Sequence, residues 1–390
     1  MMQARTPLAP ASPVIAFLRR MPFAALTAVA LVGCTSDSLP AQIQQSRHHD
    51  FRVARVVTGL EHPWSLAFLP DGSLLVTERP GRLRLVRDGV LVPTPVAGVP
   101  EVWSRGQGGL MDVVLHPAFA DNRLVYLSYS KPGTRGATTA VVRGRLEGDR
   151  LADVEEVIEA DAWSRRGQHF GSRLAFDPAG YLYVTTGDRG DMGRAQDPTD
   201  HAGVTLRVHD DGRVPADNPF SGRTDARPEI FTYGNRNGQG LAVHPVTGQV
   251  WQNEHGPRGG DEINLLLPGR NYGWPVVSHG VHYDGRRVSD RTERAGMESP
   301  LHHWTPSIAT SGMAFYEGDL FPDWRGDLFV GGLAGQVLVR VRFDGTRMVE
   351  EERLLERIGR VRDVRVSPDG AVYVVLDASD ASILRIEPAR

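Results

Sequence analysis

The sequence contains a single cysteine, Cys34, so no internal disulfide bond can form and stability must come from a large packed core. Lysine is almost absent among the basic residues, and the formal net charge is only -3. This balance provides no basic face for nucleic acid and no polybasic stripe for a membrane, so it favours a neutral or weakly charged partner. No dinucleotide fingerprint, Walker loop, HExxH motif or Cys/His zinc spacing is present, which removes the commoner cofactors.

The N-terminus carries a targeting signal. Two consecutive arginines precede an apolar run, Met21–Val32, that is too short for a comfortable transmembrane helix. The run leads into Leu-Val-Gly-Cys, which ends at Cys34 and is typical of a lipoprotein signal peptide. We therefore expect residues 1–34 to be a signal peptide and Cys34 to carry a diacylglyceryl group. The protein would then be exported to the periplasm and lipid-anchored to the outer membrane. An ordinary secretory signal with an incidental cysteine is the alternative.

One pattern recurs six times in the rest of the chain. It consists of a small residue, an alternating apolar run, a turn rich in Pro, Asp and Gly, and a second alternating run. The six copies are Ser65–Glu78, Asp112–Ser128, Arg173–Val184, Gly240–Trp251, Gly312–Val330 and Asp363–Val374. Long helices are not evident after the signal, although residues 197–211 are compatible with a short one.

Alternation at period two around such a turn is the signature of a β-hairpin with one buried face. Six hairpins, with enough sequence between them for four strands each, predict an all-β fold. We expect residues 50–390 to form a six-bladed β-propeller with four-stranded antiparallel blades. An open β-sandwich with fortuitous repeats is the alternative. Residues 35–49 are polar and without periodicity, which favours a flexible tether.

The residues just before each repeat should converge on one rim of the channel, because the innermost strand of each blade lines it. Turn propensity would supply Gly, Asn and Asp at these positions. The chain instead has hydrogen-bond donors and cationic side chains at these positions, among them His62, Gln107, His169, Arg236, Asn237, Arg360 and Arg362. One such histidine alone would more often be a hydrogen-bonded loop residue. Six coinciding positions predict a site for something planar or anionic with several carboxylate or carbonyl oxygens.

A glycine-rich stretch after the fourth repeat, residues 253–275, combines acidic side chains and amides with carbonyls freed by Gly and Pro. Such oxygen donors can form a cage for a hard cation such as calcium. An Asx-rich turn network that merely holds a long loop is the alternative.

Seven motifs occur in order along the chain, at residues 63–70, 106–110, 169–174, 254–264, 271–275, 311–316 and 360–364. As a set they resemble the soluble-type pyrroloquinoline-quinone (PQQ)-dependent sugar dehydrogenases, and within them the bacterial aldose sugar dehydrogenase branch. The resemblance implies a six-bladed propeller with PQQ across the channel top and calcium against it. The activity it implies is oxidation of aldoses at C1 to the lactone, by a monomer or homodimer that passes electrons to an external acceptor.

The resemblance also implies roles for individual residues. His169 would be the general base for the C1 hydroxyl, Asp188 would orient it and favour its charged form, and Arg236 would stabilise charge on the reduced quinone. Contacts to PQQ are implied for Gln107, Arg236, Asn237, Tyr283, Gly332, Leu333, Ala334, Arg360 and Arg362. Calcium is implied at the backbone carbonyls of Gly256 and Pro257, and a second, structural calcium at Glu262 and Tyr272.

Two positions depart from the family pattern. The segment Gly332-Leu333-Ala334 stands where the family usually carries a Leu-Lys pair, so one cation for a quinone carboxylate is missing. Gln168 stands where glucose-preferring members carry an Asp, which favours a looser aldose site.

Two other functions remain open from the residues alone. A calcium-dependent lactonase-type hydrolase on six blades predicts a central cage of several carboxylates, and a non-enzymatic binding propeller predicts an ordinary Gly-rich rim. The Arg, Gln and His residues of this rim favour the quinone enzyme over both.

Overall fold

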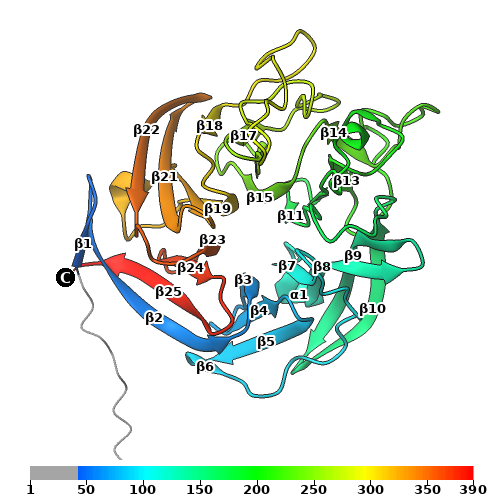
Figure 1. Cartoon of the computed structure of the whole chain (residues 1–390). Helices are drawn as coiled ribbons and strands as arrows, with labels where there is room; N and C mark the ends of the chain where they lie inside the picture. The colour runs from blue at the N-terminus through cyan, green and yellow to red at the C-terminus, as the bar shows by residue number, and fades with distance from the viewer. Residues whose placement is uncertain (1–42, 390) are drawn as a thin grey trace, which may run out of the picture. The chain divides into compact units, whose positions relative to one another are not determined.

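The computed structural model describes residues 43–389. Strands dominate this part of the chain, and they form six antiparallel sheets arranged as the blades of a ring (Figure 1). The prediction of an all-β, six-bladed propeller is therefore confirmed. The predicted signal peptide, Cys34 and residues 35–42 of the predicted tether lie outside the described residues.

Five blades consist of four strands each, consecutive in the chain. The first two are β3 (Pro63–Phe68), β4 (Leu74–Glu78), β5 (Arg82–Arg87) and β6 (Val90–Leu91), then β7 (Leu110–Leu115), β8 (Leu124–Gly133), β9 (Gly136–Glu147) and β10 (Arg150–Glu159). The third and fourth are β11 (Leu174–Phe176), β12 (Leu182–Thr185), β13 (Val204–Val208) and β14 (Ile230–Tyr233), then β15 (Gly238–Val243), β16 (Val250–Glu254), β17 (Asp261–Leu265) and β18 (His302–Trp304). The fifth is β19 (Thr310–Phe315), β20 (Leu328–Gly332), β21 (Val337–Asp344) and β22 (Arg347–Leu354).

The sixth blade closes the ring with strands from both ends of the described chain. It runs from β23 (Val361–Val366) through β24 (Val372–Leu376) and β25 (Ala381–Pro388) to β2 (Asp50–Leu60) and β1 (Ile43–Gln45). β2 pairs with β25 from Phe51 opposite Pro388 to Leu60 opposite Ala381, seen as the blue and red strands of Figure 1. Backbone hydrogen bonds between the two ends thus hold the propeller shut.

Residues 43–49 belong to this folded unit, although the sequence placed them in the tether. β1 pairs with β2, with Ile43 opposite Arg52, and the Ser46 hydroxyl donates to the His49 carbonyl at 2.7 Å. The His49 ring also packs edge-on against Trp324 at a centroid distance of 5.4 Å. Backbone pairing holds this polar segment, so hydrophobic periodicity could not reveal it.

Hydrophobic clusters fill the six spaces between neighbouring blades. The second strands lie between two such clusters, and every residue of β4 and of β12 is buried. A smaller cluster joins the first, second and third blades and consists of Trp64, Met111 and Phe170 near the starts of the innermost strands, with Ala137 from β9. Burial of this apolar surface is the main force that holds the blades together.

All six predicted hairpins are present as the first two strands of the six blades. The short helix considered for residues 197–211 is wrong, because Val204–Val208 forms β13 between β12 and β14. Val204, Leu206 and Val208 alternate there with Thr205 and Arg207, which is itself the pattern of a strand, and all five residues are buried. The helices of the described chain are α1 (Phe119–Asn122) and two 3-10 turns, η1 (Met192–Gln196) and η2 (Pro322–Trp324).

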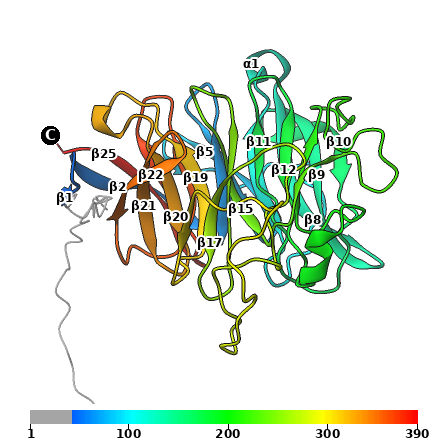
Figure 2. The same ribbon diagram turned by 90° about the horizontal axis from the view of Figure 1, so that it is seen from above.

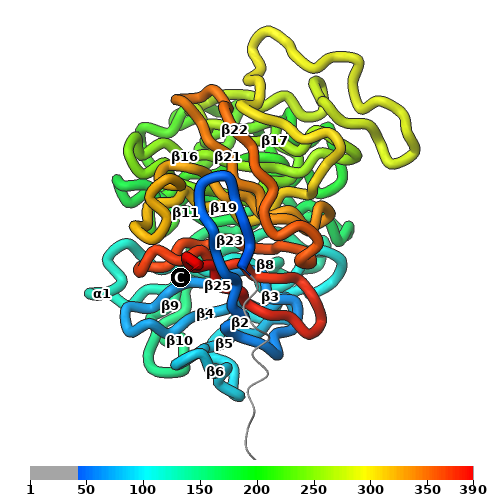
Figure 3. The backbone as a smooth tube through the Cα atoms, turned by 90° about the vertical axis from the view of Figure 1, so that its left-hand side faces the viewer, coloured from blue at the N-terminus to red at the C-terminus, as the bar shows by residue number. Residues whose placement is uncertain are grey.

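The connection between β17 and β18, residues 266–301, is the longest within residues 43–389 and projects from the ring (yellow in Figures 2 and 3). Within the same range, no helix has the length and apolar character needed to cross a membrane.

Candidate active site

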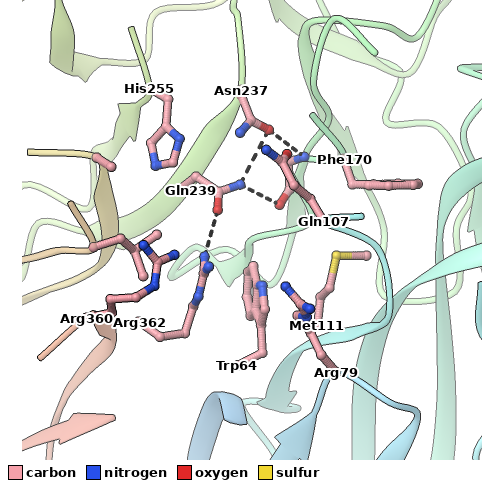
Figure 4. A pocket seen from close by; sticks show the side chains of 13 residues that line it. Trp64, Arg79, Gln107, Met111, Phe170, Asn237, Gln239, His255, Arg360 and Arg362 are labelled. Atoms are coloured by element: carbon pink, nitrogen blue, oxygen red, sulfur yellow. Dashed lines mark hydrogen bonds between the residues drawn. The ribbon is translucent and has the colours of Figure 1, made fainter. Parts of the chain in front are cut away.

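A cavity lies where the segments that lead into the innermost strands meet. It contains about 580 Å³ of empty space, part of it open to solvent. Its lining residues come from all six blades (Figure 4): Trp64, Arg79, Gln107, Met111, Phe170, Gly171, Asn237, Gln239, His255, Ala309, Leu333, Arg360 and Arg362.

Arginines give this cavity an excess of positive charge. Arg360 Nε donates to Asp377 Oδ2 at 3.1 Å, and Arg362 lies 3.8 Å from the same oxygen. Asp377 also hydrogen-bonds with His62 Nδ1 at 2.8 Å, so one carboxylate serves several cationic or polar neighbours. Burial lowers the pKa of Arg362 to about 10, against the opposing effect of Asp377. An anionic ligand would relieve this excess charge.

Amide side chains also line the cavity, next to these arginines. Asn237 Oδ1 accepts a hydrogen bond from the Gly171 amide at 3.0 Å, and the Gln239 amide group donates to the Gly171 carbonyl at 3.1 Å. Gln239 Oε1 in turn accepts from Arg362 at 3.0 Å (Figure 4). The network fixes these amides, so their remaining polar atoms are preorganised for a ligand.

His169 and Asp188 form a buried pair beside the cavity. Nδ1 of His169 lies 2.5 Å from Oδ1 of Asp188, and the two side chains are 11% and 0% exposed. Asp188 also accepts hydrogen bonds from the Trp274 indole at 2.8 Å and from the Gly190 amide at 2.7 Å. The proton of His169 therefore sits on Nδ1, and Nε2 is free to accept another. The His169 amide donates to Gln107 Oε1 at 2.7 Å, which ties this pair to the cavity wall.

Burial lowers the pKa of His169 below its ordinary value, although the hydrogen bond that His169 donates to Asp188 opposes this effect and Arg236 adds to it. Asp188 thus favours the charged form of His169, as expected, but burial outweighs it. For Asp188 itself, burial opposes ionisation, while the hydrogen bond with His169 and nearby positive charges lower its pKa overall. At neutral pH the pair is an imidazole beside a carboxylate, which is the state that a general base requires.

The backbone at His169 is held in an uncommon conformation. Its φ of 54° lies in the left-handed region, which a non-glycine residue rarely adopts. Gly187 packs against it so closely that a Cβ there would meet the His169 carbonyl oxygen at 2.2 Å. Arg189 supports the same segment, since its guanidinium lies 3.5 Å from the Phe170 ring centroid and donates to the Gln168 carbonyl. Surrounding packing therefore fixes the ring position of His169.

A smaller second cavity adjoins the first through His255, which lines both. Glu254 and Glu262 face each other on the paired strands β16 and β17, and both line this cavity. Burial and the charge of Glu254 raise the pKa of Glu262 to about 8. The side-chain oxygen of Asn264 is buried there without a hydrogen-bond partner. These groups are oxygen donors and include two closely spaced carboxylates, so they are suited to binding a hard cation.

Backbone oxygens would have to complete such a cation site. Within residues 43–389, no group of three or more His, Cys, Asp or Glu side chains is arranged to hold a metal ion. Gly256 lines the second cavity beside the buried Pro257, and its amide donates to Asp261 Oδ1 at 2.8 Å. A Cβ at Gly256 would meet the Gly259 carbonyl oxygen at 2.2 Å, so the tight turn requires glycine.

The sequence profile of the family described as "Glucose / Sorbosone dehydrogenase" matches residues 60–385. The chain belongs to this family. Aldose sugar dehydrogenase YliI of Escherichia coli (strain K12) is 45% identical over 336 residues, which cover 84% of this chain and 91% of that protein.

Solved structures agree with this assignment. The apo-form of the soluble aldose sugar dehydrogenase from Escherichia coli has a TM-score of 0.85 and 42% identity, covering 87% of this chain and 100% of that one. The PQQ-bound form of the aldose sugar dehydrogenase from Streptomyces coelicolor has a TM-score of 0.73 and 28% identity, covering 89% and 97%. The protein is therefore an oxidoreductase that acts on sugars, and the hydrolase and binding-platform alternatives are set aside.

In this sugar dehydrogenase, most of the residues singled out from the sequence lie at the two cavities. Gln107, Asn237, Leu333, Arg360 and Arg362 line the first, and Arg236, Gly256, Glu262 and Tyr272 line the second.

Three predicted cofactor contacts lie elsewhere. Tyr283 is 73% exposed on the projecting connection, and Ala334 is also exposed. Gly332 is buried at the end of β20, opposite Thr310, and does not line the first cavity. The Tyr272 hydroxyl is engaged with the backbone of Leu265 and Leu267, so a cation could use only its carbonyl.

Several residues of this site were given no role from the sequence. Arg79 directly follows β4, and Met111 and Gln239 lie within innermost strands rather than before them. His255 donates Nε2–H to the Thr310 carbonyl at 2.5 Å, while burial and the charges of Arg236 and Arg362 lower its pKa to about 3. These residues lie within a hairpin or directly after one. A search of those positions, in addition to the positions before each hairpin, would have found them.

Proposed function

We propose that this sugar dehydrogenase oxidises the C1 hydroxyl of aldoses to the lactone, with PQQ as its bound cofactor and calcium as its metal. The observation that carries the proposal is a neutral His169, oriented by Asp188, beside a cavity that holds more arginines than carboxylates. The PQQ-bound relative from Streptomyces coelicolor supports the choice of cofactor.

The first cavity fits PQQ by the chemistry of its lining. PQQ is a flat tricyclic quinone with three carboxylates. Trp64, Met111 and Phe170 offer apolar surface for a flat ring, and the arginines offer partners for carboxylates. Asn237 and Gln107 would hold its polar edge. Arg360 and Arg362 would neutralise its charge.

Calcium fits the oxygen-rich second cavity. Burial first, and then the charge of Glu254, raise the pKa of Glu262, and a divalent cation would offset both effects. Glu262 and the carbonyl of Tyr272 would hold the structural ion. The carbonyls of Gly256 and Pro257 would hold the ion next to PQQ, where it would polarise the cofactor.

In the reaction, His169 Nε2 accepts the proton of the sugar C1 hydroxyl while Nδ1–H remains hydrogen-bonded to Asp188. Asp188 stabilises the imidazolium that forms, and the Trp274 indole keeps Asp188 in place. PQQ, when bound, supplies the acceptor for the hydride that leaves C1. Arg236 lines the second cavity, and its Nε is buried without a partner, so it can stabilise negative charge that develops nearby. The sugar loses one proton and one hydride and becomes the lactone, and the electrons then pass to an external acceptor.

Gln168 supports a broad aldose preference. Its neutral side chain is exposed and lies over Gly190, where a Cβ would meet its amide nitrogen at 2.3 Å. The chain thus has no carboxylate immediately before His169 to select one pattern of sugar hydroxyls, and we expect several aldoses to be oxidised.

Reconstitution tests the proposed function. The purified chain, supplied with PQQ and calcium, should reduce an artificial dye when glucose or xylose is added, and the same protein without PQQ should not. If PQQ is bound and no member of an aldose panel supports dye reduction, PQQ-dependent sugar oxidation is refuted.

Calcium should raise the melting temperature of the protein more at about pH 9 than at about pH 6, because a ligand carboxylate must be ionised. Glu262, with a pKa of about 8 in the metal-free protein, is protonated at the lower pH. Glu262→Gln should lose most of the calcium effect, whereas Glu293→Gln, on the exposed part of the projecting connection, should retain it. Differential scanning calorimetry with and without a chelator measures both. Equal calcium effects in the wild type and Glu262→Gln would contradict the site.

We further propose that Cys34 is lipidated and anchors the exported protein to the outer membrane, on the basis of the apolar run before it. Cys34→Ala should then move the protein from the membrane fraction to the soluble periplasmic fraction. Unchanged fractionation would refute the anchor.

A further inference from the structure

Arg79 is a cation of the first cavity to which neither the family resemblance nor the proposed mechanism gives a role. It directly follows β4 and lines the cavity beside Trp64 and Met111 (Figure 4). Its guanidinium makes no hydrogen bond and no ion pair with any residue between 43 and 389, and its Nε is buried. The side chain as a whole is half-buried, and an anion in the cavity would give it the partner that the described residues do not supply.

The surrounding residues do not supply that anion. Arg360 and Arg362 already share the single carboxylate of Asp377. With three arginines and one carboxylate, the cavity retains two uncompensated positive charges. Arg79 and Arg360 also both act to lower the pKa of Arg362, which shows that the three cations repel one another. The cavity is therefore built for a ligand that carries more than one negative charge.

The three arginines lie on two sides of Trp64, an apolar residue of the cavity lining. Arg360 and Arg362 lie on one side of Trp64, and Arg79 lies on the other (Figure 4). Trp64 is 2% exposed, and the Arg173 guanidinium packs 4.1 Å from its ring centroid. Arg173 is itself fixed by Asp363 at 2.9 Å and Asp112 at 3.2 Å, so the indole cannot turn to fill the space. A flat ligand that crosses the cavity past Trp64 would bring one end to Arg79 and the other to Arg360 and Arg362.

We propose that Arg79 binds a carboxylate of PQQ at the end of the cofactor opposite to that held by Arg360 and Arg362. The identity of the ligand rests on the proposed function, whereas the need for a planar anion with separated carboxylates rests on the cavity itself. Arg79 is a binding residue in this scheme and takes no part in proton transfer.

Titration calorimetry of the cofactor-free chain with PQQ tests this inference. Arg79→Gln should weaken PQQ binding about 10- to 100-fold, the range for loss of a charge-assisted hydrogen bond. Arg79→Lys should lie between the wild type and Arg79→Gln, because it keeps the charge and loses the planar fork. Arg87→Gln removes an exposed arginine at the end of β5 and should leave the affinity unchanged.

Two further readouts separate binding from a structural role. The melting temperature of the cofactor-free protein should be unchanged or raised in Arg79→Gln, because no partner is lost and repulsion of Arg362 is relieved. With the trimethyl ester of PQQ, which lacks the negative charges, the wild type and Arg79→Gln should bind about equally. Equal affinity for PQQ, or a lower melting temperature of the cofactor-free variant, would overturn the role of Arg79. A wild-type chain that binds no PQQ would instead refute the proposed function.

Discussion

Replacing His169 by glutamine should lower turnover on the order of a hundredfold or more while PQQ still binds, because the variant keeps a polar side chain but has no basic nitrogen. His169 does not line the first cavity, and its side chain is 11% exposed and hydrogen-bonded to Asp188 at 2.5 Å. Steady-state dye reduction gives the turnover number, and calorimetric titration gives the affinity for PQQ.

A second histidine provides the matched control for this prediction. His209 lies in the turn after β13, lines neither cavity and packs against Tyr181. His209→Gln should keep full turnover. Undiminished turnover in His169→Gln would show that another group takes the C1 proton.

Asp188→Asn should lower turnover by about 10²- to 10⁴-fold, because the neutral amide no longer holds the proton of His169 on Nδ1. In the wild type, Asp188 accepts from His169, from the Trp274 indole and from the Gly190 amide. Asparagine has one acceptor oxygen and a donor group, so it cannot satisfy all three. The kcat should fall far more than the affinity for PQQ.

The pH profile of the same variant gives an independent test. The acidic limb of kcat/KM should follow the pKa of His169, which burial holds below its ordinary value, so the wild type should remain active below that ordinary value. The charge of Asp188 raises the pKa of His169, so its removal should move the limb to still lower pH. A limb that moves to higher pH in Asp188→Asn would contradict this assignment. Thermal unfolding of the variant checks that loss of a buried charge has not unfolded the protein.

The hairpins could be predicted because each depends on short-range information. The alternation in Ser65–Glu78 or Arg173–Val184 requires only that neighbouring strands bury one face and that a turn with Gly reverses the chain. The strand at Val204–Val208 carries the same short-range signal, because its three apolar residues alternate with Thr205 and Arg207 and are buried in the core. β1 does not, since its polar residues are held only by pairing with β2.

The position of Tyr283 could not be predicted from the sequence. It lies on the long connection between β17 and β18, where no periodicity constrains the conformation, and its side chain is 73% exposed. Arg79 shows the opposite case, since it directly follows the second strand of its hairpin, on the same rim as the residues that precede the first strand. Its position beside Trp64 and Met111 depends on how the first and second blades pack.

The sequence by itself determined the number of blades, the first two strands of each and the group of polar residues that precede them, because these features follow from alternation and turns within about twenty residues. Only the tertiary structure decided that the N-terminal and C-terminal strands close the ring and that Trp274 reaches Asp188. It also decided that Arg79 remains without a carboxylate among the described residues. These contacts join residues from different blades or distant segments, so their distances depend on blade packing rather than on neighbours in the chain.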